Sequence, residues 1–530
     1  MPGMRPADIG LLTNPGDVTI APDGGRAVYT LTTVDAAANT YRSRLWLVRT
    51  DGGAAPRPLS AGHDRDASPR WSPDGTMLAW VSSGDEGTAI RVIAVDGPGE
   101  SAVVCRWPDR ITELAWAPTG DRLAFAGRVR DLDRYGTPDR PKKDADMPPR
   151  RITRLMSRHD GEDWVVDRPT HVHVVPVDGS APATALTSGE SAAGSIAWAP
   201  DGRRLCYVSA THDTWDLDGR DDVWVIDAGG GTPTKLTDTT MSWGQPAWSP
   251  DGSSIALFVH PTPLEEPRHG QLRVIDVASR QVTRWAADLD RNLRPYPYAR
   301  PPMWLSADEV VISYEEHGGS RVAVVSAPEG GSTGKIRDVV GGRQVVRSWD
   351  AAAGTIAFVA TGPAEQPELW ATSLDGGEAR KLTDHGATLR ERVTLVAPER
   401  FTATSADGTE VECWAMAPVG AEPGRRYPTI LNIHGGPFTQ YGWGFFDEFQ
   451  LQTGAGLGVV FCNPRGSSGY TEAWGRAIRW PEAPVDPGSG WGGVDYEDVM
   501  ACAEEATKRF DWVDGERLGV QGGSYGGYMT

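Results

Sequence analysis

Two features of the 530-residue chain predict its fold class. Seven copies of one strand–turn–strand pattern predict an N-terminal, all-β, seven-bladed β-propeller over residues 1–395. A later set of continuous apolar strands, ending in a glycine-flanked serine turn, predicts the first half of an α/β-hydrolase domain over residues 396–530. The chain is longer than one ordinary domain, which also favours two domains.

The clearest repeat is Trp-Ser-Pro-Asp-Gly at 71–75, followed by an apolar run at 77–81. In each copy an apolar residue ends one strand, Pro and Asp-Gly reverse the chain, and a second strand leaves with alternating apolar side chains. A second hairpin and a short polar edge strand complete most units. Four strands at a period of roughly 45 to 55 residues are typical of propeller blades, whereas a solenoid, the alternative, has shorter repeats. The other copies begin at Ile20, Trp116, Trp198, Trp248, Trp304 and Trp349.

The interval between the copies at Trp116 and Trp198 is longer than the others. Its extra segment, about residues 128–168, is dense in charge, as at Lys142-Lys143 and Arg150. We expect a solvated insertion between blade strands. The alternative is a flap or a subunit contact at the propeller rim. If the segment is only solvated, its deletion leaves activity and oligomeric state unchanged.

The repeat ends near residue 396. A hairpin follows at 400–415, and continuous apolar strands follow at 429–433 and 457–462. Strands of this kind are buried on both faces, as in a parallel sheet covered by helices. A helix is predicted from about Asp495, its cap, to Phe510. Its predicted buried face contains Tyr496, Val499, Met500, Ala503 and Ala506.

The last predicted strand leads into Gly-x-Ser-x-Gly, with Gly522, Ser524 and Gly526 in the motif positions. This pattern is typical of a nucleophile elbow, a strained strand-to-helix turn that exposes the serine hydroxyl. Flanking side chains would clash in so sharp a turn, which explains the glycines. We therefore predict Ser524 as the catalytic nucleophile. A glycine-rich structural turn is the alternative.

Acyl transfer also needs donors for a developing oxyanion. In this fold one N–H comes from the residue after the serine and another from the loop after the third strand. Here these are the amides of Tyr525 and of Gly436, in the turn His434-Gly435-Gly436-Pro437. His434 precedes the serine and ends a strand, so we expect a structural role. The loop 463–470 either shapes the pocket or only turns the chain.

These motifs, with Asn-Pro-Arg-Gly at 463–466 and Gly-Gly-Val-Asp-Tyr at 492–496, occur in an order that resembles the prolyl oligopeptidase family of serine peptidases, most closely its acylaminoacyl-peptidase branch. The resemblance covers essentially the whole chain. It implies a propeller that restricts the active site to short peptides, with Ser524 as nucleophile and the amides of Gly436 and Tyr525 as oxyanion donors. It also implies that the first dozen residues pack on the hydrolase domain. Related dipeptidyl peptidases carry a paired glutamate after Asp-Trp-x-Tyr, which this chain lacks.

In the hydrolase fold the acid and the histidine follow the serine, but only six residues follow Ser524. We therefore expect a fragment of a longer gene product, without the triad Asp and His, rather than a natural pseudoenzyme. Without its base a triad serine loses about 10,000-fold or more of its activity, so the fragment is expected to be inactive. The alternatives to a serine peptidase are an esterase on the same fold and a propeller binding protein with an inactive hydrolase remnant.

The net charge of −19 argues against nucleic acid and anionic membrane as partners. Short peptides are the expected partners, and homo-oligomerisation stays open. Five scattered cysteines predict free thiols and a cytoplasmic location. No metal-ligand spacing or phosphate-binding loop is present, so no metal or cofactor is expected. The pairs Glu265-Glu266 and Glu315-Glu316 are expected to be solvated rather than to bind a substrate amine.

Overall fold

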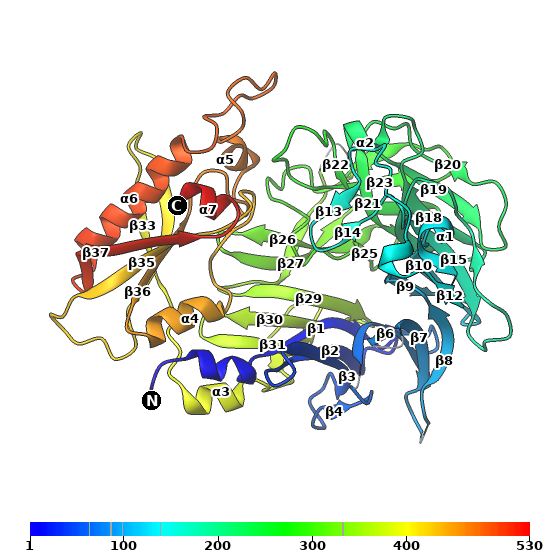
Figure 1. Cartoon of the computed structure of the whole chain (residues 1–530), viewed down its shortest axis with the longest axis horizontal. Coiled ribbons are helices and arrows are strands. Elements are labelled where there is room, and N and C mark those ends of the chain that lie inside the picture. The colour runs from blue at the N-terminus through cyan, green and yellow to red at the C-terminus, as the bar shows by residue number, and fades with distance from the viewer. Residues whose placement is uncertain (63, 85–86, 98, 138, 331–332) are drawn as a thin grey trace.

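The computed structural model describes residues 1–62, 64–84, 87–97, 99–137, 139–330 and 333–530. Two groups of sheets lie side by side (Figure 1). Antiparallel sheets from the first three-quarters of the chain form one group. A mixed sheet with helices, built from the remaining residues, forms the other. No helix within the described ranges is long and apolar enough to cross a bilayer.

The first group begins with an eight-stranded sheet in which two four-stranded units meet at one parallel pair, Ser43 with Arg65. Five four-stranded antiparallel sheets follow along the chain. The strands of the eight-stranded sheet are β1 (Thr13–Ile20), β2 (Arg26–Asp35), β3 (Thr40–Arg49), β4 (Arg57–Pro58), β5 (Arg65–Trp71), β6 (Met77–Gly84), β7 (Gly87–Ala94) and β8 (Ala102–Trp107). The next two sheets contain β9 (Ile111–Trp116), β10 (Arg122–Arg128), β15 (Thr170–Pro176) and β16 (Thr184–Ala185), then β17 (Ala193–Trp198), β18 (Arg204–Ser209), β19 (Asp222–Asp227) and β20 (Thr234–Lys235).

The last three sheets of this group have the same four-stranded form. Their strands are β21 (Ser242–Trp248), β22 (Ser254–His260), β23 (Gln271–Asp276) and β24 (Val282–Arg284); β25 (Met303–Trp304), β26 (Glu309–Glu316), β27 (Gly319–Ser326) and β28 (Ile336–Val340); and β29 (Val345–Ala352), β30 (Thr355–Gly362), β31 (Glu365–Ser373) and β32 (Arg380–Lys381). The helix α3 (Ala387–Arg392) follows.

The repeated motif forms the turn between the first two strands of a unit. Trp71 ends β5, and Gly75 has a φ of 70°, a conformation that favours glycine. The carboxylate of Asp74 accepts hydrogen bonds from the Ser72 hydroxyl at 2.6 Å and from the Thr76 amide at 3.1 Å. The residues of the motif thus satisfy the polar groups of the turn locally, which is why the turn can be recognised in the sequence.

The second strand of each unit is buried on both faces, contrary to the predicted alternation. In β22, Ala256 and Phe258 belong to the core shared with β26, whereas Ile255 and Leu257 belong to the core shared with β18. Each sheet therefore packs between two neighbours. The first and last units also share a core, which includes Tyr29 and Leu369.

The second group is a five-stranded sheet in the order β33-β34-β36-β35-β37, in which β35 is parallel to β36 and to β37. The carboxyl ends of these three strands therefore lie at one edge, where the His434 turn, the loop 463–470 and the Ser524 turn begin. The strands are β33 (Glu399–Thr404), β34 (Glu410–Met416), β35 (Tyr427–Ile433), β36 (Gly458–Asn463) and β37 (Val513–Gly522). The helices are α4 (Asp447–Gly454), α5 (Glu472–Arg476), α6 (Val494–Arg509) and α7 (Tyr525–Met529).

Helix α6 differs from its prediction in two respects. Gly493 is its N-cap, so Asp495 lies inside the first turn rather than at the cap. Its buried face contains the carboxylates of Asp495 and Asp498, whereas Tyr496 and Met500, predicted to be buried, are exposed. The pattern of hydrophobic residues predicted the wrong buried face, because Asp495 and Asp498 have polar partners beneath the helix.

The N-terminal segment packs between the two groups: the short helix η1 (Pro6–Leu11) contacts β2 and α3, and the residues before it reach the second group. Met4 is buried in a core with Phe445. A Cβ on Gly3 would lie 2.3 Å from the Cα of Gly454, the last residue of α4. This contact agrees with the packing that the family resemblance implies. All five cysteines are free thiols, and four of them are buried: Cys206, Cys413, Cys462 and Cys502.

Candidate active site

Ser524 lies in the turn between β37 and α7. Its backbone has φ 56° and ψ −120°, a conformation that a residue with a side chain adopts only under strain. The residue is exposed. Tyr525 is the first residue of α7, so its N–H has no acceptor within the helix and can donate to a group beside Ser524.

The two elbow glycines lie where no side chain fits. A Cβ on Gly522 would lie 2.4 Å from the carbonyl carbon of Gly526. A Cβ on Gly526 would lie 2.1 Å from the carbonyl oxygen of Ile433, at the end of β35. The serine turn is thus packed backbone against backbone on the neighbouring strand.

The turn after β35 borders the nucleophile. A Cβ on Gly435 would lie 3.6 Å from the Cβ of Ser524 and 3.2 Å from the carbonyl oxygen of Gly523. Gly436 has a φ of 118°, which favours glycine. The structure therefore brings together the strand ends that carry both predicted oxyanion donors and the serine.

The side chain of Tyr525 is anchored beneath the elbow. Its hydroxyl donates to Oδ2 of Asp495 at 2.6 Å, and the Gly492 amide donates to the same oxygen at 3.2 Å. Asp495 and Tyr525 are both buried. Burial and the Asp495 carboxylate raise the pKa of Tyr525, so its phenol stays protonated and remains a donor. This pair could not be predicted from the sequence, because Asp495 fitted equally well as a helix cap.

We expect Tyr525→Phe to lower the free energy of unfolding by roughly 1–3 kcal/mol, because it removes a donor from a fully buried carboxylate. Urea denaturation measures the change. Tyr528→Phe is the matched control, since its hydroxyl lies in an exposed residue and donates only to the Trp491 carbonyl at 3.2 Å. Its effect should stay within about 0.5 kcal/mol. If both variants lose the same free energy of unfolding, the buried hydrogen bond to Asp495 stabilises the fold no more than the exposed one.

His434 is buried, and its two ring nitrogens contact Ser467 and Gly435 rather than Ser524. Its Nε2 lies 2.9 Å from the Ser467 hydroxyl oxygen, and its Nδ1 lies 2.7 Å from the Gly435 carbonyl oxygen. Burial lowers the pKa of His434 to about 4. These contacts join the Gly436 turn to the loop 463–470, which agrees with the expected structural role.

This histidine should make the fold sensitive to acid. Its pKa falls from 6.5 in the unfolded chain to about 4 in the folded one. Between these values the unfolded state binds more protons, so the free energy of unfolding falls as pH falls. The expected loss from pH 7 to pH 5 is about 2 kcal/mol. Urea denaturation should show a smaller loss in His434→Gln than in the wild type, and an unchanged loss in His159→Gln, whose residue is exposed. Parallel pH profiles would contradict the assignment.

The loop 463–470 braces the sheet edge rather than shaping the cavity. The Asn463 side chain accepts from the Tyr441 amide and donates to its carbonyl, both at 2.9 Å. Arg465 pairs with Asp498 of α6 at 2.7 Å. None of the described residues 463–470 lines the cavity beside Gly436.

A cavity of about 990 Å³ lies between the two groups of sheets and reaches the predicted oxyanion turn. Gly436, Trp491 and Tyr528 line it from one group, and His260, at the end of β22, and Arg294 line it from the other. No motif or spacing pointed to His260 or Arg294, because His260 ends β22 and Arg294 lies in a later loop.

The two glutamate pairs are not simply solvated. Glu315 is buried and accepts a hydrogen bond from the Asn292 side chain at 3.0 Å. Burial raises the pKa of Glu315 to about 7. Glu265 pairs with Arg268 at 2.8 Å, and Glu266 lines the cavity. The prediction of solvated pairs is therefore wrong for Glu315, where burial and an amide partner replace water.

The sequence profile of the prolyl oligopeptidase family matches residues 443–530. A Bacillus subtilis protein named "Uncharacterized peptidase YuxL" is 30% identical over 541 residues, which cover 99% of this chain and 78% of that protein. Dipeptidyl-peptidase 5 of Porphyromonas gingivalis is 24% identical, over 98% of this chain and 75% of its own length.

Solved structures show the same fold at lower identity. The acylaminoacyl peptidase of Pyrococcus horikoshii superposes with a TM-score of 0.80 at 21% identity, over 98% of this chain and 75% of that one. A puromycin-hydrolyzing peptidase of Mycobacterium tuberculosis superposes with a TM-score of 0.71 at 18% identity, over 100% of this chain and 77% of its own.

Proposed function

Because the chain belongs to the prolyl oligopeptidase family of serine peptidases, we propose that it cleaves short peptides through an acyl-enzyme on Ser524. The observation that carries this proposal is the strained backbone of Ser524 beside the Gly435-Gly436 turn, at a cavity between the two groups of sheets. The names of its relatives, an acylaminoacyl peptidase among them, support peptides as substrates.

The chemistry follows from this geometry. The Ser524 oxygen attacks the carbonyl carbon of the scissile peptide bond, and the oxyanion that forms accepts from the amides of Tyr525 and Gly436. The amine then leaves, and water releases the acyl group. In this fold the acid and base of the triad follow the serine in the chain. Activity is therefore measured on a protein that contains all three residues of the triad.

We also propose that residues 1–395 form a seven-bladed propeller and residues 396–530 belong to the hydrolase domain. Seven four-stranded units, with a core shared by the first and the last, support the propeller. Loops of these units line the cavity beside Gly436, which supports a role in restricting substrate access. The five free thiols support a cytoplasmic location.

A fluorophosphonate probe tests the proposal, because it bonds covalently to an activated serine hydroxyl. We expect the complete protein to be labelled on the peptide that contains Ser524, and Ser524→Ala to remain unlabelled. An unlabelled wild type would favour a binding protein with an inactive hydrolase. Comparing a peptide amide with a small ester then separates a peptidase from an esterase, since only a peptidase hydrolyses the amide efficiently.

Release of amino-terminal dipeptides is a second candidate. Glu266 lines the cavity and can pair with a substrate amine, and the Porphyromonas gingivalis relative is named a dipeptidyl-peptidase. Matched peptides with free and acetylated amino termini separate the two activities. If Glu266 binds the amine, Glu266→Gln should raise the KM of the free peptide alone, by about 10-fold, with kcat unchanged. Equal KM changes for both peptides would reject this role.

A further inference from the structure

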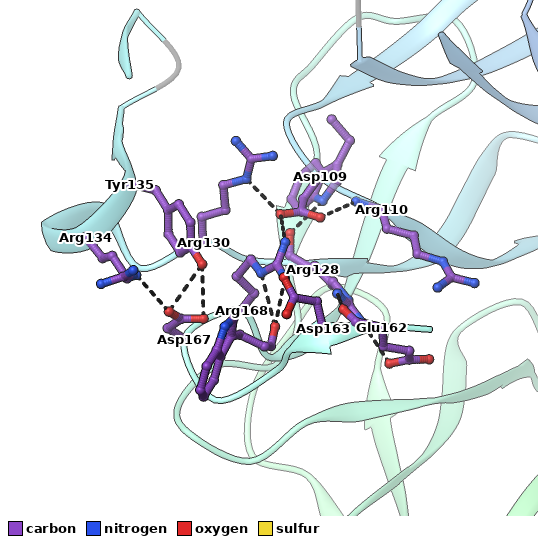
Figure 2. Close-up of polar contacts among 12 residues, drawn as sticks. Asp109, Arg110, Arg128, Arg130, Arg134, Tyr135, Glu162, Asp163, Asp167 and Arg168 are labelled. Atoms are coloured by element: carbon purple, nitrogen blue, oxygen red, sulfur yellow. Dashed lines mark hydrogen bonds and ion pairs between the residues drawn. The ribbon is translucent and has the colours of Figure 1, made fainter. Parts of the chain in front are cut away.

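The charged segment between β10 and β15, described at residues 129–137 and 139–169, is tied down by ion pairs at several points. Asp109 pairs with Arg130 at 2.7 Å, and Asp167 pairs with Arg134 at 3.1 Å (Figure 2). Asp167 also pairs with Arg150 at 2.7 Å. Both acidic side chains are less than one-tenth exposed. Most described residues of the segment are exposed, which agrees with the expected solvated insertion, but these buried ion pairs hold it at defined points.

A second anchor fixes the C-terminal half of this segment. The buried guanidinium of Arg128, at the end of β10, donates to the Glu162 carboxylate at 2.7 Å and to its carbonyl oxygen at 3.0 Å (Figure 2). The segment contains a short helix, α1 (Leu132–Tyr135). It also contains a short hairpin formed by β13 (Arg158–His159) and β14 (Asp163–Trp164). Both halves are thus tied to the sheet that contains β10.

The anchored segment forms one wall of a cavity of about 1370 Å³. The opposite wall is formed by strand ends of three neighbouring units, with Glu113, Ser195 and Trp243 among its residues. His260 and Glu266 line both this cavity and the one that reaches Gly436. The two cavities therefore adjoin at these two residues.

Large apolar side chains from three separate segments are exposed in this second cavity. Leu155 of the insertion is 73% exposed, Leu217 of the short helix α2 (Trp215–Asp218) is 58% exposed, and Leu264 of the loop after β22 is 71% exposed. Met156 lies beside Leu155 in the same wall. Exposed apolar side chains that converge on one cavity indicate a binding site for an apolar ligand.

We propose that this cavity is a distal subsite that binds apolar side chains of an oligopeptide substrate, away from the scissile bond. The proposal rests on the proposed function, since the occupant is the peptide cleaved at Ser524. The position of this cavity next to the one beside Gly436, with His260 and Glu266 shared by both, supports this occupant. Four arginines of the wall already have acidic partners, and the exposed apolar side chains are the attraction on which the proposal depends. These arginines are Arg130, Arg134, Arg150 and Arg168.

Peptide binding to the Ser524→Ala protein tests the subsite without catalysis. The probes are three fluorescently labelled peptides: an octapeptide rich in Leu and Phe, the same octapeptide with Ser at the Leu and Phe positions outside its central tripeptide, and that central tripeptide alone. We expect Leu155→Ser combined with Met156→Ser to raise the Kd of the apolar octapeptide about 10-fold or more. The Kd values of the other two peptides should change less than twofold.

Ile152→Ser is the matched control, because Ile152 lies in the same segment, is 54% exposed and does not line the cavity. It should leave all three Kd values unchanged, and thermal unfolding should confirm that each variant is folded. The proposed subsite is overturned if the double variant binds the apolar octapeptide with the Kd of the parent protein. It is also overturned if the Kd of the tripeptide rises by the same factor as that of the octapeptide. Fluorophosphonate labelling of the wild type reports separately on the proposed function, so the two failures are distinguishable.

Discussion

Ser524→Ala is expected to lower kcat/KM for a short peptide amide by about 10,000-fold or more. The substitution removes the only atom that would bond to the substrate carbonyl, while the amides of Tyr525 and Gly436 remain. The residual rate should then reflect binding and the oxyanion donors alone. Steady-state hydrolysis of a chromogenic peptide by the complete protein measures the effect.

Ser180→Ala is the matched control, because Ser180 is exposed in a loop of the first group of sheets. Its kcat/KM should equal that of the wild type, and the unfolding transitions of all three proteins should coincide. A Ser524→Ala protein that keeps more than about 1% of the activity would place the nucleophile elsewhere.

Local turn chemistry explains how much of the fold could be predicted. The Asp74 carboxylate accepts from groups two residues away on either side, so the motif specifies its turn without distant contacts. The elbow is similar, because Gly522 and Gly526 are needed for contacts within one strand-to-helix turn and its neighbouring strand. Such signals lie within a few residues of one another and are therefore visible in the sequence.

Packing between separate segments explains what could not be predicted. The two-sided burial of β22 depends on sheets far away in the chain, and its sequence of apolar residues fits one or two buried faces equally well. The cavity brings His260 and Arg294 together with Trp491 from the other group. These residues lie side by side only because the two groups of sheets pack together, so no spacing in the sequence connects them.

The role of Asp495 at the site also depends on packing that the sequence does not reveal. A carboxylate near a helix start is usually read as a cap or a favourable charge at the dipole. Here it is buried beneath the helix and accepts from Tyr525, the residue that follows the nucleophile. Only the placement of α6 against the elbow makes this pairing possible.

Gly526→Ala is expected to damage the site through a single added methyl group. Its Cβ would lie 2.1 Å from the carbonyl oxygen of Ile433 and 2.9 Å from that of His434. Both are backbone atoms, so relief requires the elbow to move away from the turn that carries Gly436. A shift of about 1 Å between nucleophile and oxyanion donors costs on the order of 100-fold in kcat. Overpacking should also lower the free energy of unfolding by roughly 1–3 kcal/mol.

The neighbouring Gly523→Ala separates this effect from a general intolerance of alanine in the turn. A Cβ on Gly523 would meet no described atom within 4 Å, so its free energy of unfolding should stay within about 0.5 kcal/mol of the wild type. Urea denaturation and fluorophosphonate labelling rates of both variants provide the measurement. If Gly526→Ala unfolds and reacts like the wild type, the close approach of the elbow to β35 is wrong. The oxyanion site would then lose its geometric basis, because that approach is what brings Gly436 beside Ser524.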